Sequence, residues 1–425
     1  MGESEKMSEE RSNITREWEL YMYLLRCAIK EEQLEEQILA KYQDIESKQI
    51  RERAKRNGQL FLLDANIYEY AVYRKEENIA QKIGINKVIY EYEKYKCIRN
   101  VLALAKENKL PFVIFKGCVL ADLYPQYVQR SSCDTDIFVN YEYREKAIEV
   151  LVNAGYVINE EHSKNEVCVL QYSKFPHAIE LHSCLWEDYE GKRLDILKSF
   201  GLTDADKLIK LETCGFEVTT LGYEEHLIYQ LFHIIKHFSL EGVGMKYLAD
   251  ITLYVDAYGK YIDYQRMWKR LEELDYAKFA HYLFAICIEF LGMDRVILEN
   301  RKMSMGNEFY EFMIDLFNGG VMYEDKSDSW QILGMMTPYF TGEKGSSKGK
   351  IGRKLAVIFP RAKDIQEYYP YLKKCPFLLP VAWVQKAVKY LINYRTKSNN
   401  WYSASEKLNV AEHRIDLMDK LGLLG

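Results

Sequence analysis

The sequence predicts an α+β fold, a small mixed β-sheet core flanked by N-terminal and C-terminal helical regions. Apolar residues recur at three- and four-residue spacing through the first 110 residues and again after residue 223, which is typical of amphipathic helices. Between residues 111 and 185, short apolar runs alternate with Gly, Pro and one helical stretch, which is typical of a mixed sheet. We therefore expect three regions, 1–110, 111–200 and 201–425.

The N-terminal region begins with a dozen charged and polar residues, for which we expect a flexible tail. From residue 14 to residue 57, aromatic and aliphatic side chains such as Trp18, Tyr21 and Leu25 follow helical spacing. A second helical stretch covers residues 66–108 and ends before Pro111.

The central region contains the predicted strands. After the strand 112–115, Gly117 begins a turn that leads into a short helix at 119–124. A longer helix covers residues 143–154, and Gly155 ends it. The remaining apolar runs predict four further strands, at 134–139, 157–158, 167–172 and 178–182.

The C-terminal region is helical from about residue 223 onward. Residues 344–363 carry seven Lys or Arg and no acidic residue. Two interpretations remain open for this basic segment: a solvated loop and helix face, or a contact surface for a phosphate-rich acceptor such as RNA.

Composition limits the class of protein. A formal net charge of -5 disfavours a protein that coats nucleic acid, because such binding depends on basic surface. The nine cysteines show no zinc-site spacing, and the polar N-terminus contains no signal-peptide core. No apolar stretch approaches the roughly 20 residues of a membrane span. These features predict a cytoplasmic protein with reduced thiols and no membrane partner.

Two carboxylates open the strand at 134–139. Asp134 and Asp136 are separated by one residue, so in a strand they point to the same face, about 6.6 Å apart at Cα. Their oxygens can converge on a divalent cation, and Mg²⁺ prefers such ligands. Glu180, between apolar neighbours in a later strand, is the candidate third ligand. The alternative is a solvated strand end.

The turn after the first strand has the pattern of a phosphate-binding site. The sequence Lys116-Gly117-Cys118 joins a strand to a helix, and such turns direct backbone N–H groups and a helix N-terminus at phosphate oxygens. Arg130 lies four residues before Asp134, where we expect it to reach a triphosphate.

These features together resemble the DNA polymerase β-like nucleotidyltransferase superfamily and, within it, a largely uncharacterised bacterial nucleotidyltransferase family. The resemblance covers about residues 112–390. Its matching segments are Lys116-Gly117, Tyr124-Pro125, Arg130, Asp134-Thr-Asp136-Ile, Gly155-Tyr156, Ile179-Glu180-Leu-His182, His233, Lys236-His237, Gly244–Ile251 and parts of 358–383.

The resemblance implies an enzyme that moves an NMP from an NTP to an acceptor hydroxyl and releases pyrophosphate. ATP is among the candidate donors, and the acceptor would be a small molecule, a protein or an RNA. Asp134, Asp136 and Glu180 would be catalytic and would hold Mg²⁺, or Mn²⁺ in its place. The implied nucleotide-binding residues are Lys116, Gly117, Cys118, Arg130, His237, Lys246 and Asp250. The family pattern has Ser or Gly at position 118, whereas a thiol is a weak donor.

Two other functions remain open. Cys118 also fits a nucleotide-binding regulatory module without turnover, although retention of the three carboxylates argues against it. A toxin of a toxin–antitoxin pair that modifies tRNA would need a basic acceptor surface, for which residues 344–363 are the candidate.

Overall fold

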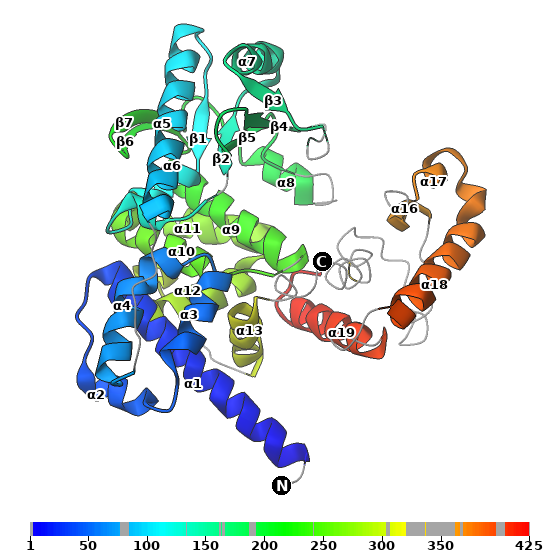
Figure 1. The fold of residues 1–425 in the computed structure, drawn as a ribbon. Helices are drawn as coiled ribbons and strands as arrows, with labels where there is room; N and C mark the ends of the chain where they lie inside the picture. The colour runs from blue at the N-terminus through cyan, green and yellow to red at the C-terminus, as the bar shows by residue number, and fades with distance from the viewer. Residues whose placement is uncertain are drawn as a thin grey trace. The chain divides into compact units, whose positions relative to one another are not determined.

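The computed structural model describes residues 3–76, 85–132, 134–160, 163, 166–186, 193–240, 242–302, 307–319, 336, 362–365, 369–396 and 404–424 (Figure 1). The chain divides into two compact units. The first comprises Met1–Glu187, Asp195–Ile234 and Gly244–Met305, and the second comprises Asp188–Leu194, Ile235–Val243 and Gly306–Gly425. The first unit therefore contains both the N-terminal helices and the sheet. The assignment of three domains stays a prediction.

The N-terminal region is helical, as predicted. Its elements are α1 (Glu3–Lys30), α2 (Glu36–Leu39), η1 (Ala40–Tyr42), α3 (Ser47–Arg56), α4 (Leu60–Tyr73) and α5 (Ile85–Glu107). The expected N-terminal tail is wrong, because α1 already begins at Glu3. Acidic residues in a first turn interact favourably with the helix dipole, and Glu, Lys and Met are good helix formers.

Strands and helices alternate in the central region. The strands are β1 (Val113–Phe115), β2 (Asp134–Phe138), β3 (Tyr156–Ile158), β4 (Val167–Tyr172), β5 (Ala178–His182), β6 (Ile209–Thr213) and β7 (Phe216–Thr220). The helices between them are α6 (Gly117–Ala121), η2 (Tyr127–Gln129), α7 (Tyr141–Asn153) and α8 (Arg193–Ser199). The five strands predicted from the sequence are confirmed, whereas the β6–β7 hairpin was not predicted.

The rest of the described chain is helical. The elements are α9 (Tyr223–Leu240), α10 (Lys246–Tyr258), η4 (Gly259–Tyr261), α11 (Tyr264–Glu273), α12 (Ala277–Leu291), η5 (Arg295–Leu298), α13 (Asn307–Asn318), α16 (Ala362–Ile365), α17 (Tyr371–Lys374), η6 (Pro376–Leu378), α18 (Leu379–Thr396) and α19 (Ala404–Lys420). None of the helices in the described part of the chain is both long and apolar enough to cross a membrane. The eight described cysteines are free thiols.

The central sheet has the strand order β1-β2-β5-β4-β3. Strands β2 and β5 are parallel, whereas the other neighbouring strands are antiparallel. This mixed sheet between helical regions confirms the predicted α+β fold class.

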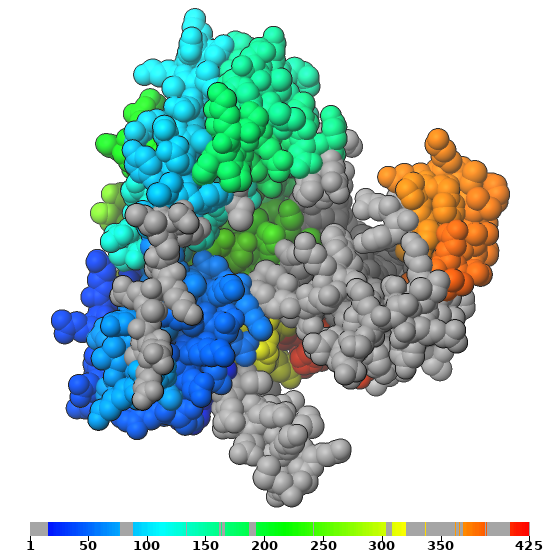
Figure 2. Space-filling view, viewed as in Figure 1, coloured from blue at the N-terminus to red at the C-terminus, as the bar shows by residue number. Residues whose placement is uncertain are grey.

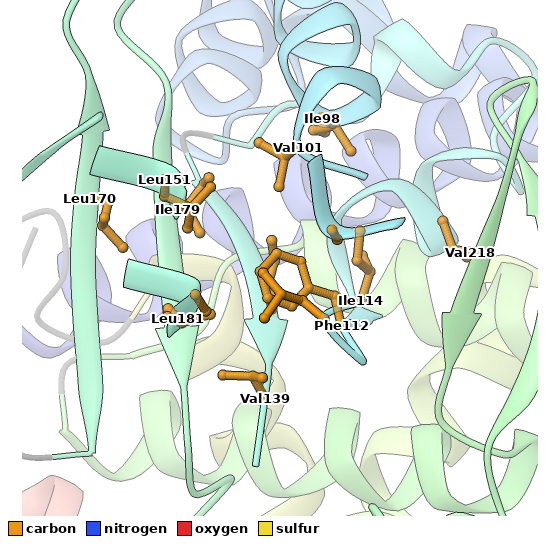
Figure 3. Packing of buried hydrophobic residues seen from close by; sticks show 14 of the residues in the cluster. Ile98, Val101, Phe112, Ile114, Val139, Leu151, Leu170, Ile179, Leu181 and Val218 are labelled. Carbon is orange, nitrogen blue, oxygen red and sulfur yellow. The ribbon is translucent and has the colours of Figure 1, made fainter. Parts of the chain in front are cut away.

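One face of the sheet is apolar. Its row of paired residues runs from Ile114 through Ile137 and Leu181 to Cys168, all buried. Helices α5 and α7 contact each other and pack against this face. Their atoms form part of the outer surface at the top of Figure 2, in cyan and blue-green. Figure 3 shows side chains of both helices, among them Val101 and Leu151, directed at the strands. Because side chains alternate along a strand, residues of β2 and β5 next to this row point to the opposite face.

Candidate functional site

The opposite face of the sheet carries the predicted carboxylates. The parallel register of β2 and β5 places Asp136 directly beside Glu180, and Asp134 lies two pairs earlier on the same face. His182 follows Glu180 by two residues and therefore shares this face. The sequence predicted that Asp134 and Asp136 share one face and that Glu180 is a third ligand, and the strand register places Glu180 on the same face. Their role as metal ligands stays a prediction.

Asp136 lies between the ammonium group of Lys116 and the imidazole of His182. The Nζ atom of Lys116 is 2.9 Å from Asp136 Oδ1, and His182 Nε2 is 3.2 Å from the same oxygen. Burial disfavours the ionised carboxyl, yet Lys116 and His182 outweigh it and hold the pKa of Asp136 well below its usual range. Burial also disfavours the charged form of His182 and by itself would lower the pKa of the imidazole. The hydrogen bonds of His182 to Asp136 and Glu180 outweigh burial, and the pKa is raised.

For Asp134, the effects that raise the pKa outweigh those that lower it. Burial, together with the negative charges of Asp136 and Glu180, raises the pKa of Asp134. Lys116 and Lys246 act in the other direction but do not cancel this effect. Lys246, the first residue of α10, is thus near enough to influence the carboxylates. A partly buried carboxylate beside two others forms a site that a divalent cation would stabilise.

The turn between β1 and α6 is strained at its first residue. Lys116 has φ 55° and ψ -126°, and Gly117 follows with φ 28°. The N–H of Lys116 donates to His226 Nε2 at 3.0 Å. Burial, followed by the charges of Lys116 and Arg130, lowers the pKa of His226 to about 3, so the ring is neutral and Nε2 can accept. Backbone strain of this kind is common at functional sites.

The strain at Lys116 leads to a stability prediction. Lys116→Gly is expected to have a free energy of unfolding about 1 kcal/mol above that of Lys116→Ala, because only Gly adopts this φ without steric cost. Both variants lose the ammonium group, so their difference isolates the backbone. Urea unfolding of the two proteins measures it.

The matched control is Lys96, an exposed residue inside α5. There the order should reverse, with Gly about 1 kcal/mol less stable than Ala, because Gly is unfavourable in a helix. Equal stabilities of the two Lys116 variants would contradict the strain argument.

Cys118 is buried, and its thiol belongs to the apolar cluster on the other side of the sheet. Burial raises the pKa of this thiol far above its usual range. The backbone carbonyl oxygen of Cys118 accepts a 2.8 Å hydrogen bond from Thr213 Oγ1 on β6. Any contribution of Cys118 to nucleotide binding would therefore come from its backbone, and the predicted role stays a prediction.

Arg130 and Asp250 form a buried pair. Arg130 Nε and Nη2 donate to the two Asp250 oxygens at 2.7 and 2.9 Å, and Tyr124 Oη donates to Oδ1 at 2.8 Å. Arg130 Nη1 also donates to the Gly117 carbonyl at 3.4 Å. The pair thereby connects α10 to the β1–α6 turn. Its predicted contact with nucleotide stays a prediction.

His237 is the remaining predicted nucleotide-binding residue, and residues 344–363 are the predicted basic segment. His237 is in the last turn of α9 and belongs to the second unit, so its predicted role in nucleotide binding also stays a prediction. All but the last two residues of the basic segment 344–363 lie outside the described residues.

Aromatic residues that the sequence did not single out surround Lys116. Its ammonium lies 5.5 Å from the Tyr229 ring centroid, and Phe115 packs against Tyr229 at 4.9 Å. Burial raises the pKa of Tyr247 to about 12, with Asp134 among the charges that act on it. Tyr229 falls in an apolar helical stripe of α9, a pattern that predicts core and gives no functional signal.

Comparison with known protein families identifies the class of enzyme, the nucleotidyltransferases. Residues 92–292 match the family described as "Uncharacterised nucleotidyltransferase". The matched residues contain β1, β2, β5, α9 and α10 and thus every group described around the carboxylates. The protein is accordingly a nucleotidyltransferase, and this part of the chain is similar to that uncharacterised family.

Two solved structures of the antibiotic-resistance factor ANT(2'')-Ia are also similar. A solution structure is 14% identical, with 46% of this chain and 96% of that chain covered and a TM-score of 0.32. A crystal structure in complex with adenylyl-2''-tobramycin is 14% identical, with 42% and 95% covered and the same TM-score. No curated protein matches the sequence.

Proposed function

We propose that this enzyme transfers an NMP from an NTP to an acceptor hydroxyl, with release of pyrophosphate, in a reaction that depends on divalent cations. The observation that carries the proposal is the register of β2 and β5, which gathers Asp134, Asp136 and Glu180 on one face. The family match over residues 92–292 supports the nucleotidyl transfer itself.

The donor set fits a divalent cation. Asp136, Glu180 and His182 each offer one ligand atom, and these atoms lie within 4.8 Å of one another. Asp134 adds a carboxylate whose ionisation is disfavoured by its neighbours. Asp134, Asp136 and Glu180 would hold Mg²⁺ or Mn²⁺. When bound, the cations would neutralise charge on the triphosphate and assist ionisation of the acceptor hydroxyl.

In the proposed reaction the acceptor oxygen forms a bond to the α-phosphorus and loses its proton to water. The bond from the α-phosphorus to the bridging oxygen breaks, and pyrophosphate leaves. The Lys116 N–H is already bonded to His226, which holds the turn in place. The N–H groups of Gly117 and Cys118 lie in the first turn of α6, where no helical acceptor precedes them. We propose that these two backbone groups, rather than the thiol, orient the phosphates.

The test is a thermal-shift panel of ATP, GTP, CTP and UTP, each with and without Mg²⁺ or Mn²⁺. A ligand that binds the native state raises its stability by mass action. One or more NTPs should stabilise the wild type only when metal is present. The variant Asp134→Asn/Glu180→Gln should not respond, whereas Glu217→Gln, on an exposed face of β7, should respond like the wild type.

The stabilising NTP, labelled at the α-phosphate, is then incubated with small-molecule, protein and RNA fractions. Label should enter one fraction, with one pyrophosphate released per NMP transferred. If no NTP stabilises the wild type in either metal, the proposed function is wrong. Nucleotide binding without incorporation into any fraction would instead favour the regulatory module.

A further inference from the structure

The side chain of His182 lies among the carboxylates but has no place in the three-carboxylate arrangement. It is on β5, two residues after Glu180, and is paired with Phe138, two pairs beyond Asp136 in the β2–β5 register. We propose that His182 is a direct ligand of the divalent cation, together with Asp136 and Glu180. Its imidazole would shift the preference of the site from Mg²⁺ toward first-row transition ions. This inference rests on the metal dependence proposed above.

The distances between donor atoms fit a shared ion. His182 Nε2 is 3.2 Å from Asp136 Oδ1 and 3.6 Å from Glu180 Oε2. Two adjacent ligands of one octahedral ion, each about 2.1 Å from it, are separated by about 3.0 Å. A small adjustment of the His182 and Glu180 side chains is therefore sufficient for all three donor atoms to reach one ion.

The surroundings of the ring fix its direction. The imidazole is 12% exposed, and its centroid lies 5.5 Å from that of Phe115 in an edge contact. Nε2 is the nitrogen that faces both carboxylates. The Asp136 side chain is 6% exposed and that of Glu180 is 36% exposed. Solvent therefore reaches the cluster at Glu180, where water or phosphate oxygens would complete the coordination shell.

The chemistry of the donor set gives the expected preference. Mg²⁺ takes oxygen ligands almost entirely, whereas imidazole nitrogen suits transition ions. A site with two carboxylates and one imidazole should therefore favour Mn²⁺ over Mg²⁺ more strongly than an all-oxygen site. The competing role for His182 is a hydrogen bond that positions Asp136 without contact to the metal.

Pulsed EPR of the Mn²⁺-loaded full-length protein separates these two roles. A nitrogen bound directly to Mn²⁺ gives a ¹⁴N modulation of the electron spin echo, which a hydrogen-bonding histidine does not. The wild type should show this modulation, and His182→Gln should retain bound Mn²⁺ but lose the modulation. The control is His177→Gln, because His177 is on the segment leading into β5 and is bonded to Thr135 on β2. It should leave the modulation unchanged.

Calorimetric titration of Mn²⁺ and Mg²⁺ supplies the second readout. His182→Gln should weaken Mn²⁺ binding about tenfold and Mg²⁺ binding by less than about threefold. A wild-type Mn²⁺ complex without ¹⁴N modulation, or a wild type that does not bind Mn²⁺, overturns the inference.

Failure of the inference can be distinguished from failure of the proposed function. If the wild type shows nitrogen modulation but no NMP transfer, His182 is a metal ligand and the proposed function is wrong. If NMP transfer depends on metal but the modulation is absent, the proposed function stands and His182 is a positioning residue, not a ligand.

Discussion

Asp134→Asn is expected to make the metal-free protein more stable while it abolishes NMP transfer. The raised pKa of Asp134 means that its ionised form is disfavoured in the folded state. At neutral pH that charge therefore lowers the free energy of unfolding, and its removal should raise it by about 1 kcal/mol. Residues that cost stability in the absence of ligand are typical of active sites.

Asp136→Asn should have the opposite effect on stability. The pKa of Asp136 is lowered by Lys116 and His182, so its ionised form stabilises the fold above the carboxyl's unfolded pKa and is fully effective at neutral pH. Neutralising it leaves the buried Lys116 ammonium without its nearest anion. A loss of about 3 kcal/mol follows from breaking a buried pair. Both Asn variants should reduce transfer by at least about 10³-fold, because charge neutralisation in the transition state is lost.

The measurement is urea unfolding in EDTA and again with saturating Mn²⁺. Metal should stabilise the wild type by mass action and should stabilise Asp134→Asn far less, so the order of the two proteins reverses between conditions. The control, Glu217→Gln, should follow the wild type in both. If Asp134→Asn is less stable than the wild type in EDTA, burial and the neighbouring carboxylates do not disfavour the ionised form of Asp134.

The sequence predicted the strands of the sheet but not the pairing of β2 with β5. Each strand is a short apolar run with turn residues at its ends, and that pattern is local. The pairing joins residues 134–138 to residues 178–182 across an intervening helix and two strands. No local pattern specifies it. Glu180 was the candidate third carboxylate because it lies between apolar neighbours in a predicted strand, but its position directly beside Asp136 follows only from the pairing.

The missed β6–β7 hairpin did leave a signal. Ile209, Leu211 and Thr213 alternate with charged residues, and Cys214 and Gly215 between the strands both have positive φ. A two-residue turn with Gly at its second position between alternating runs is a hairpin pattern. The Arg130–Asp250 ion pair left no such local signal in the sequence, because the two residues are 120 positions apart.

Arg130→Met is expected to cost about 3–5 kcal/mol of the free energy of unfolding, because it leaves the buried Asp250 carboxylate without its cation. The side chains of Arg130 and Asp250 are 5% and 3% exposed. Among the described residues, Tyr124 would then be the remaining side-chain donor to that carboxylate. The double variant Arg130→Met/Asp250→Leu should recover at least half of the loss, since an apolar pair of similar volume needs no charge compensation. Urea unfolding of the two single variants and the double variant measures the coupling.

The control is the exposed pair Arg16–Asp44, where Arg16→Met should cost less than about 1 kcal/mol. A double variant no more stable than Arg130→Met would show that the loss comes from packing and not from an unpaired charge. The stable double variant also tests the nucleotide contact predicted for Arg130. If NTP still stabilises it as it does the wild type, the pair acts by holding α10 against the β1–α6 turn. If NTP does not, the guanidinium is needed for binding, directly or through the Gly117 carbonyl to which it donates.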